Sequence, residues 1–225
     1  MILDVDGTLV DSNDAHAQAW VGAFAEHRIT VPFDAVRRAI GMGGDKLMPI
    51  VAGIDAASLP GEHISARRGE IFKRDFLPSI RAFPGARELL QRCAQHGLVL
   101  AIASSAKKDE LHALLDVAGL SDLIALRPSS DDAEESKPDP DIVAAALKQT
   151  GCAPDRAVMI GDTPYDVEAA LRAGIRVVGF ECGGWKREDL RGAIEVHAGP
   201  AALLEHYDTS IVGRLARQST SPAGS

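Results

Sequence analysis

The sequence predicts an α/β fold: a doubly wound parallel sheet that carries an inserted, all-helical cap domain. Short apolar runs at residues 1–3, 98–103, 157–160 and 175–179 alternate with stretches of helical length, and this alternation is typical of a parallel sheet flanked by helices. Residues 15–79 have helical patterning and no strand pattern. We therefore assign residues 1–14 and 80–225 to the core domain and residues 15–79 to the cap domain.

The cap is expected to contain four helices, over residues 14–27, 34–40, 45–51 and 57–76. The first of them has one apolar stripe, at the spacing of a helix face, formed by Ala17, Trp20, Val21 and Phe24. Asn13 or Asp14 can cap its start, and Asp45 can cap the third helix after a glycine-rich break.

In the core, helices are expected over residues 84–97, 107–118, 140–150, 164–173, 187–193 and 200–207. After the opening strand, further strands are expected over residues 98–103, 123–126, 157–160, 175–179 and 194–197. Continuous apolar runs indicate strands that are buried on both faces. Only Met1–Leu3 precede Asp4, so either the first strand is short or the natural chain begins upstream. The tail from about Gln218 has a disordered composition.

Composition argues against several classes of protein. With 46% apolar and 25% charged residues, the chain fits a soluble globular protein. A net charge of −8 and the lack of a basic stretch argue against nucleic-acid binding. No apolar run reaches membrane-spanning length, and early acidic residues do not fit a signal peptide. Three distant cysteines, Cys93, Cys152 and Cys182, favour reduced thiols. We expect a cytoplasmic monomer or weak dimer.

The opening strand ends in two carboxylates, Asp4 and Asp6, that are two positions apart. Residues i and i+2 of a strand share a face, so both side chains would point the same way, and Gly7 permits a tight turn after them. Two close carboxylates repel each other unless a positive charge lies nearby. Mg²⁺ meets that need and leaves room for a phosphate oxygen. One carboxylate could then attack phosphorus while the other moves a proton.

The string Asp4-Val-Asp-Gly-Thr-Leu-Val-Asp-Ser12 resembles the signature of the haloacid dehalogenase superfamily. The resemblance implies that Asp4 is the nucleophile that forms an aspartyl-phosphate. It also implies that Asp6 is the general acid/base and binds Mg²⁺ through its backbone carbonyl. Haloacid dehalogenases proper lack the second aspartate, so its presence favours phosphoryl chemistry over cleavage of a carbon–halogen bond.

Three further polar positions follow in the core, and ligands of open α/β sheets bind at the carboxyl ends of strands. Ser104 follows the apolar run 98–103 and could hold a phosphoryl oxygen or cap a helix. Lys137 lies in a proline-stiffened loop, where a fixed ammonium would offset repulsion between nucleophile and phosphate. Asp162 follows the run 157–160, and Asp166 lies one helical turn later.

These positions match the second, third and fourth motifs of the same superfamily, in order. The resemblance implies catalytic roles for Ser104 and Lys137 and makes Asp162 a Mg²⁺ ligand together with Asp4 and Asp6. Asp166 would act through a water molecule or by orienting Lys137.

The cap contributes candidate substrate-binding residues rather than a clear motif. His16 lies where the cap joins the core, although a helix-surface histidine is an equal alternative. Residues 41–46 resemble the cap loop that reads the leaving group in relatives with a helical cap, while an ordinary turn between helices stays possible. The candidates for substrate binding are His16, Gly43, Gly44, Lys46 and Ser105, and the candidates for a cationic clamp are Arg37, Arg38, Arg67 and Arg68. Gly183-Gly184-Trp185 has no assigned role.

Together these features predict a Mg²⁺-dependent phosphatase that hydrolyses a small phosphorylated metabolite through an aspartyl-phosphate. Phosphoglycolate phosphatase-like enzymes are the nearest in pattern. A sugar phosphomutase resembling β-phosphoglucomutase has the same motifs and cap and is the main alternative. A catalytically silent binding protein on this fold is the alternative from another class, and it is disfavoured because no motif residue is missing.

Overall fold

The computed structural model describes residues 1–125 and 127–220, and its centre is a parallel sheet of five strands. The strands are β1 (Ile2–Leu3), β2 (Ala101–Ile102), β3 (Val158–Gly161), β4 (Arg176–Phe180) and β5 (Glu195–His197). Their order across the sheet is β2-β1-β3-β4-β5, and all neighbours pair in parallel. The prediction of a doubly wound parallel sheet is therefore confirmed.

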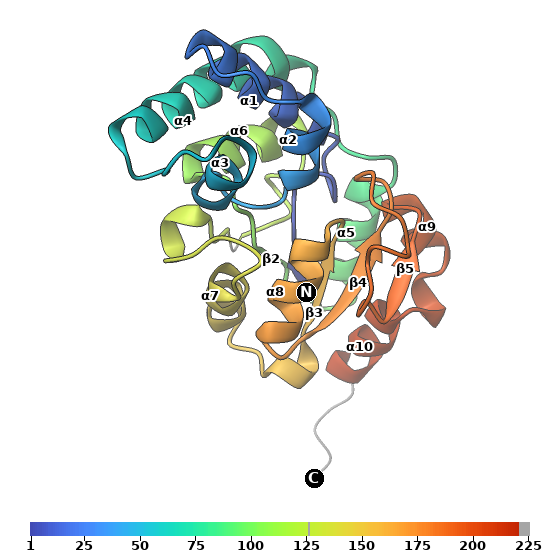
Figure 1. The fold of residues 1–225 in the computed structure, drawn as a ribbon. Helices are drawn as coiled ribbons and strands as arrows, with labels where there is room; N and C mark the ends of the chain where they lie inside the picture. The colour runs from blue at the N-terminus through green and yellow to red at the C-terminus, as the bar shows by residue number, and fades with distance from the viewer. Residues whose placement is uncertain (126, 221–225) are drawn as a thin grey trace.

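Helices cover both faces of this sheet (Figure 1). The helices α7 (Asp141–Thr150) and α8 (Pro164–Arg172) pack on one face, and α5 (Ala86–Gln95), α9 (Pro200–Glu205) and α10 (Ile211–Thr220) lie on the other. Adjacent residues of β1 serve the two faces, because Ile2 packs in one hydrophobic cluster and Leu3 in the other. Burial on both faces explains why the strand sequences are continuously apolar.

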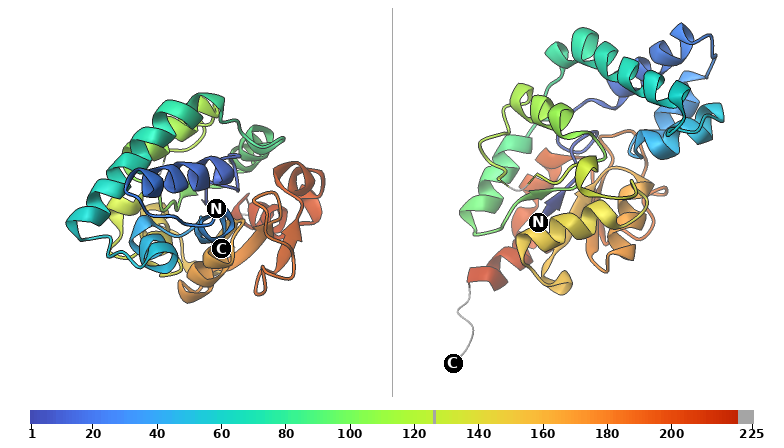
Figure 2. Two further views of the ribbon diagram at one scale, coloured as in Figure 1. Left: turned by 45° about the horizontal axis from the view of Figure 1, so that its top comes forward. Right: turned by 90° about the vertical axis from the view of Figure 1, so that its left-hand side faces the viewer.

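The cap consists of helices that gather over the carboxyl ends of the strands (Figures 1 and 2). They are α1 (Asn13–Glu26), α2 (Phe33–Ala39), α3 (Gly44–Ala52) and α4 (Leu59–Ile71), followed by a π-helical turn (Phe72–Phe76) and a 3₁₀ turn (Leu77–Ser79). The core helix α6 (Lys108–Val117) packs near this last turn. The prediction of an all-helical cap is confirmed, whereas the exact domain boundaries stay a prediction.

Two expected helix caps were wrong. Ser12, not Asn13 or Asp14, is the N-cap position of α1, and Asn13 already belongs to the helix. Gly43 is the N-cap position of α3, and the Asp45 carboxylate instead accepts a hydrogen bond from Ser136 Oγ at 2.9 Å. In both cases a partner in the core takes the polar side chain away from its own helix.

Two expected core elements are also absent from the described residues. No strand forms over residues 123–125, and the last residue of that expected strand, 126, lies outside the described residues. Arg127 donates to the Ile124 carbonyl, which a strand would have offered to a neighbouring strand, and to the Ser121 carbonyl just before the expected strand. Residues 187–193 form successive turns rather than a helix, and Gly192, with φ of +106°, interrupts helical geometry there.

Other elements differ mainly in length. The remaining expected helices begin and end within two residues of the prediction, except that the helix expected over 57–76 changes to π-helical geometry at Phe72. The run 98–103 contributes only Ala101–Ile102 to the sheet. Helix α10 was not predicted, and it includes residues 218–220, where disorder was expected; residues 221–225 lie outside the described residues. None of the described helices has the length and apolar character needed to cross a membrane.

Candidate active site

The order of the strands brings the predicted core residues together at one edge of the sheet. Asp4 follows β1, Ser104 follows β2 and Asp162 follows β3, and β1 lies between the other two strands. Parallel pairing continues just past the strand ends, since the Asp4 amide donates to the Ile160 carbonyl at 2.9 Å. This edge is also the switch point of the doubly wound sheet, where such folds bind ligands.

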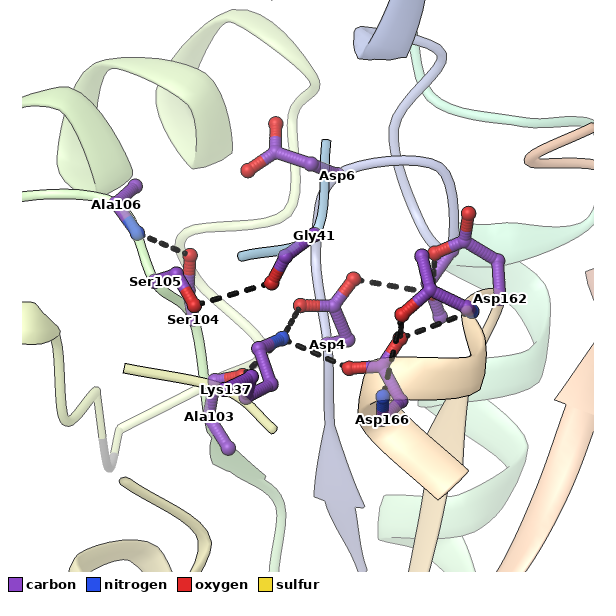
Figure 3. A network of polar contacts seen from close by, with 12 residues as sticks. Asp4, Asp6, Gly41, Ala103, Ser104, Ser105, Ala106, Lys137, Asp162 and Asp166 are labelled. Atoms are coloured by element: carbon purple, nitrogen blue, oxygen red, sulfur yellow. Dashed lines mark hydrogen bonds and ion pairs between the residues drawn. The ribbon is translucent and has the colours of Figure 1, made fainter. Parts of the chain in front are cut away.

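Lys137 is the centre of the polar network at this edge (Figure 3). Its ammonium is fully buried and donates to Asp4 Oδ1 at 2.5 Å, to Asp166 Oδ1 at 2.8 Å and to the Ala103 carbonyl at 3.2 Å. Burial alone would lower the pKa of Lys137, but the charges of Asp166 and Asp4 outweigh burial and raise it. Lys137 is therefore a fixed, permanently charged group beside Asp4.

Asp162 and Asp166 are held by neighbouring polar groups. Thr8 Oγ1 donates to Asp162 Oδ1 at 2.9 Å, and Asn13 Nδ2 donates to Asp162 Oδ2 at 3.0 Å. Thr163 caps α8 in a reciprocal capping box with Asp166, whose Oδ2 accepts from the Thr163 amide and hydroxyl. Because Lys137 and Thr163 occupy its two oxygens, Asp166 is suited to orienting Lys137.

The cluster carries more negative than positive charge. One carboxylate oxygen each from Asp4, Asp162 and Asp166 lies within 4.8 Å of the others, and all three residues are buried. Burial raises the pKa of Asp4 to about 7, against the opposing effect of Lys137. Burial, together with the charges of Asp166 and Asp4, raises the pKa of Asp162 well above its usual value. Three buried carboxylates with one ammonium fit a hard divalent cation, which would supply the missing positive charge.

Asp6 lies apart from this cluster. Its carboxylate points away from Asp4 and Asp162 (Figure 3) and accepts from Ser12 Oγ at 2.5 Å and from His16 Nε2 at 2.8 Å. Burial would raise the pKa of Asp6, but the charge of His16 and hydrogen bonds from His16 and Ser12 outweigh it and lower the pKa. The ring of His16 stacks on Phe72 at a centroid distance of 4.0 Å. His16 is thus a buried partner of Asp6 rather than a helix-surface residue.

Two cavities lie between cap and core at this edge. The inner one, of about 50 Å³, is lined by residues that include Asp6 and His16. The outer one, of about 580 Å³, is lined by residues that include Ser104 and Lys107. Gly43, Gly44 and Ser105 line both cavities. A group bound in the inner cavity would therefore lie next to Asp6.

Lys46, a predicted substrate-binding residue, holds the cap to the core instead. Its ammonium pairs with Asp139 and lies 3.5 Å from Glu135 Oε2. Close by, the Gly43 amide donates to Ser136 Oγ at 3.1 Å. The cap loop therefore docks on the same loop that carries Lys137.

Of the arginines expected to form a cationic clamp, Arg68 alone lines these two cavities. Arg68 Nη1 donates to both oxygens of the buried Glu110 carboxylate, at 2.7 and 2.9 Å, so this ion pair joins α4 of the cap to α6 of the core. Arg67 pairs with Glu26 and Glu70 on the cap. The four arginines therefore do not line one site together in this structure.

Sequence reasoning missed several residues of the site. Thr8, Asn13 and Thr163 orient the carboxylates, and Glu110 engages Arg68. Thr8 and Asn13 lie in or beside the opening motif, and a small polar residue in a tight loop next to carboxylates could have been noticed. The pairing of Glu110 with Arg68 carries no sequence signal, because it depends on how cap and core meet.

The Gly183 loop contacts Asp162 so closely that only glycine fits. A Cβ on residue 183 would lie 1.7 Å from Asp162 Oδ2, so Gly183→Ala must displace either the loop or the carboxylate. We expect the free energy of unfolding to fall by about 1–3 kcal/mol, measured by chemical denaturation. The matched control is Gly69→Ala in α4, where a Cβ would meet nothing within 4 Å. Equal stability of Gly183→Ala and the wild type would contradict this close contact.

The geometry defines a class of protein: an α/β enzyme with a buried acidic cluster and one fixed lysine beneath a helical cap. A family model described as haloacid dehalogenase-like hydrolase matches residues 1–180. The chain is 32% identical over 214 residues to a phosphoglycolate phosphatase of Rhodospirillum rubrum, which covers 90% of this chain and 88% of that protein. It is also 32% identical over 209 residues to the chloroplastic protein SUPPRESSOR OF QUENCHING 1 of Arabidopsis thaliana, covering 91% of this chain but only 19% of that longer protein.

The solved structure of a hydrolase from Pseudomonas syringae is similar along nearly its whole length, with a TM-score of 0.86, 32% identity, and coverage of 92% of this chain and 97% of that chain. The protein therefore belongs to the haloacid dehalogenase-like hydrolase family. It is an enzyme that hydrolyses phosphate esters.

Proposed function

We propose that the protein is a Mg²⁺-dependent phosphatase that acts on a small phosphomonoester through an aspartyl-phosphate on Asp4. The observation that carries the proposal is the buried Lys137 ammonium, which contacts Asp4 and Asp166 beside Asp162 at the carboxyl edge of the sheet. A nucleophilic carboxylate and a phosphate dianion repel each other, and a fixed cation beside the nucleophile lowers that cost.

The proposed chemistry assigns each step to a residue of this chain. Asp4 attacks phosphorus and displaces the leaving oxygen, which takes a proton from the carboxylic-acid form of Asp6; this form is the minority one in the free chain, because His16 and Ser12 lower the pKa of Asp6. A water molecule, deprotonated by Asp6, then attacks the aspartyl-phosphate, which releases phosphate and regenerates Asp4. The Ser104 hydroxyl, buried just past β2, would donate to a phosphoryl oxygen. The inner cavity beside Asp6 supports this assignment, since a leaving group there would meet the proton donor.

Mg²⁺ fits the donor set because carboxylate oxygens are the ligands that it prefers. Asp4 and Asp162, with the backbone carbonyl of Asp6, would hold the ion, and it would neutralise charge on the transferring phosphoryl group. Asp166 would orient Lys137 instead of binding the ion directly, since its two oxygens already have partners.

The cap, proposed to span residues 15–79, would select the substrate. The small volume of the inner cavity, about 50 Å³, favours a short leaving group. The docking of Lys46 and Gly43 on the loop that carries Lys137 would exclude water when the cap is closed. We propose phosphoglycolate as the first ester to test, because the similar protein of Rhodospirillum rubrum is named a phosphoglycolate phosphatase.

The test is phosphate release from a panel of small phosphoesters, with Mg²⁺ and with a chelator. We expect release with Mg²⁺ and loss of nearly all release with the chelator, because the cluster then lacks the charge that it needs. Restoration by added Mg²⁺ is the control for damage by the chelator. Unchanged release in the chelator would contradict the cation requirement.

The same panel separates the alternatives. No release from any ester, with isomerisation of a sugar phosphate in the presence of a bisphosphate primer, would favour the mutase. No turnover in either assay would favour a binding protein.

A further inference from the structure

Asn13, the first residue of α1, is a buried polar side chain that the proposed function leaves without a role. It is 2% exposed. Its Nδ2 donates to Asp162 Oδ2 at 3.0 Å and to the Gly183 carbonyl at 3.2 Å. Two partners outside its own helix hold this side chain, so it belongs to the site rather than to the cap of α1.

The two partners determine the orientation of the amide. Both are acceptors, so the nitrogen, which carries the two donors, must face them, and Oδ1 faces the opposite side. Oδ1 is buried and has no hydrogen-bond partner among the described residues. A buried acceptor without a partner costs free energy and is commonly explained by a water molecule or an ion.

We propose that Asn13 is a positioning residue for the divalent cation, a role that rests on the proposed function. Its nitrogen fixes Asp162 for cation binding, and its oxygen accepts a hydrogen bond from a water molecule that the cation retains. Mg²⁺ keeps several waters when proteins bind it. Groups that hydrogen-bond to the ligands of a metal ion commonly change its affinity by 10- to 100-fold.

The same contacts link the cation site to the cap. The Gly183 carbonyl also accepts from Arg37 Nη2 of α2 at 2.5 Å, so Asn13 and Arg37, from the first two cap helices, meet at one carbonyl. Gly183 lies directly against Asp162. A shift of these helices would therefore move the groups that orient Asp162, which couples cation binding to the position of the cap.

The test is calorimetric titration of Mg²⁺ into the purified full chain without any ester. Asn13→Ala is expected to raise the Kd for Mg²⁺ by about 10- to 100-fold. With saturating Mg²⁺, much of the kcat should return and the KM for the ester should change little. The matched control is Gln18→Ala, an exposed position on the same helix. A Kd within twofold of the wild-type value overturns the proposal.

Asn13→Ser keeps the test decisive if the alanine variant does not fold. Serine is well tolerated at the start of a helix, but its hydroxyl is one atom shorter than the asparagine amide and cannot hold both Asp162 and the Gly183 carbonyl. Mg²⁺ should therefore raise its Tm by less than it raises the wild-type Tm; an equal or larger rise overturns the proposal. Wild type that binds Mg²⁺ but releases no phosphate counts against the phosphatase only, and wild type that does not bind Mg²⁺ overturns both.

Discussion

Replacing Asp4 by asparagine is expected to abolish turnover while the fold survives. The amide cannot form the aspartyl-phosphate, and loss of a catalytic nucleophile typically lowers kcat by about 10⁴-fold or more. The fold should tolerate the change because burial already disfavours the Asp4 charge, raising its pKa to about 7, and because Lys137 keeps Asp166 as a partner. The measurements are phosphate release at saturating Mg²⁺ and thermal unfolding.

Asp11→Asn is the control for this experiment, since Asp11 is an exposed carboxylate of the same loop. It should retain wild-type turnover. Because Asp4 is also a proposed cation ligand, rapid acid quenching of the wild-type reaction should be used to detect the phosphorylated chain directly. Turnover of Asp4→Asn within tenfold of wild type would reject Asp4 as the nucleophile.

The sequence was most informative where a polar residue directly follows an apolar strand. Asp4, Ser104 and Asp162 each end an apolar run, and a parallel sheet brings such ends to one edge whatever the loops do. Lys137 was identified through its proline-rich loop, although the sequence could not show that its ammonium is fully buried between Asp4 and Asp166. Local pattern therefore predicted which residues meet, but not their burial.

Features that depend on tertiary contacts were not predictable. Asn13 is a residue type that commonly caps helices. Its amide belongs to the site only because Asp162 and Gly183, which are distant in sequence, lie within hydrogen-bond distance of it. Arg68 could be any surface arginine until α6 brings Glu110 against it.

The strand expected over residues 123–126 failed for a local reason. The run at 123–126 is apolar enough for a strand, but Arg127 binds the Ile124 carbonyl, which a strand would need, and the Ser121 carbonyl just before the run. The apolar pattern alone carries no information on which carbonyls a distant or nearby side chain will take. Secondary structure was therefore predictable where packing and pattern agree, as in α1 and β3, and not where a side chain competes for the backbone.

Replacing Lys137 by methionine is expected to destabilise the protein strongly as well as inactivate it. The methionine would leave Asp4 and Asp166 buried without their shared cation, and breaking a buried ion pair in this way costs about 3–5 kcal/mol. The measurement is the free energy of unfolding by urea in the presence of a chelator. Lys148→Met is the matched control, because Lys148 is an exposed lysine of α7.

The destabilisation should also depend on pH with a defined sign. Lys137 lowers the pKa of Asp4, so without it this pKa should rise above its present value of about 7, whereas in the unfolded chain Asp4 has its ordinary pKa of 3.8. The folded variant then binds more protons than the unfolded chain, and its free energy of unfolding must fall as the pH rises from about 4 through neutrality. The free energy of unfolding of Lys137→Met should thus be closest to the wild-type value at low pH and lowest at high pH. A loss of stability that is the same at pH 5 and pH 8 would show that the ammonium acts by packing rather than by its charge.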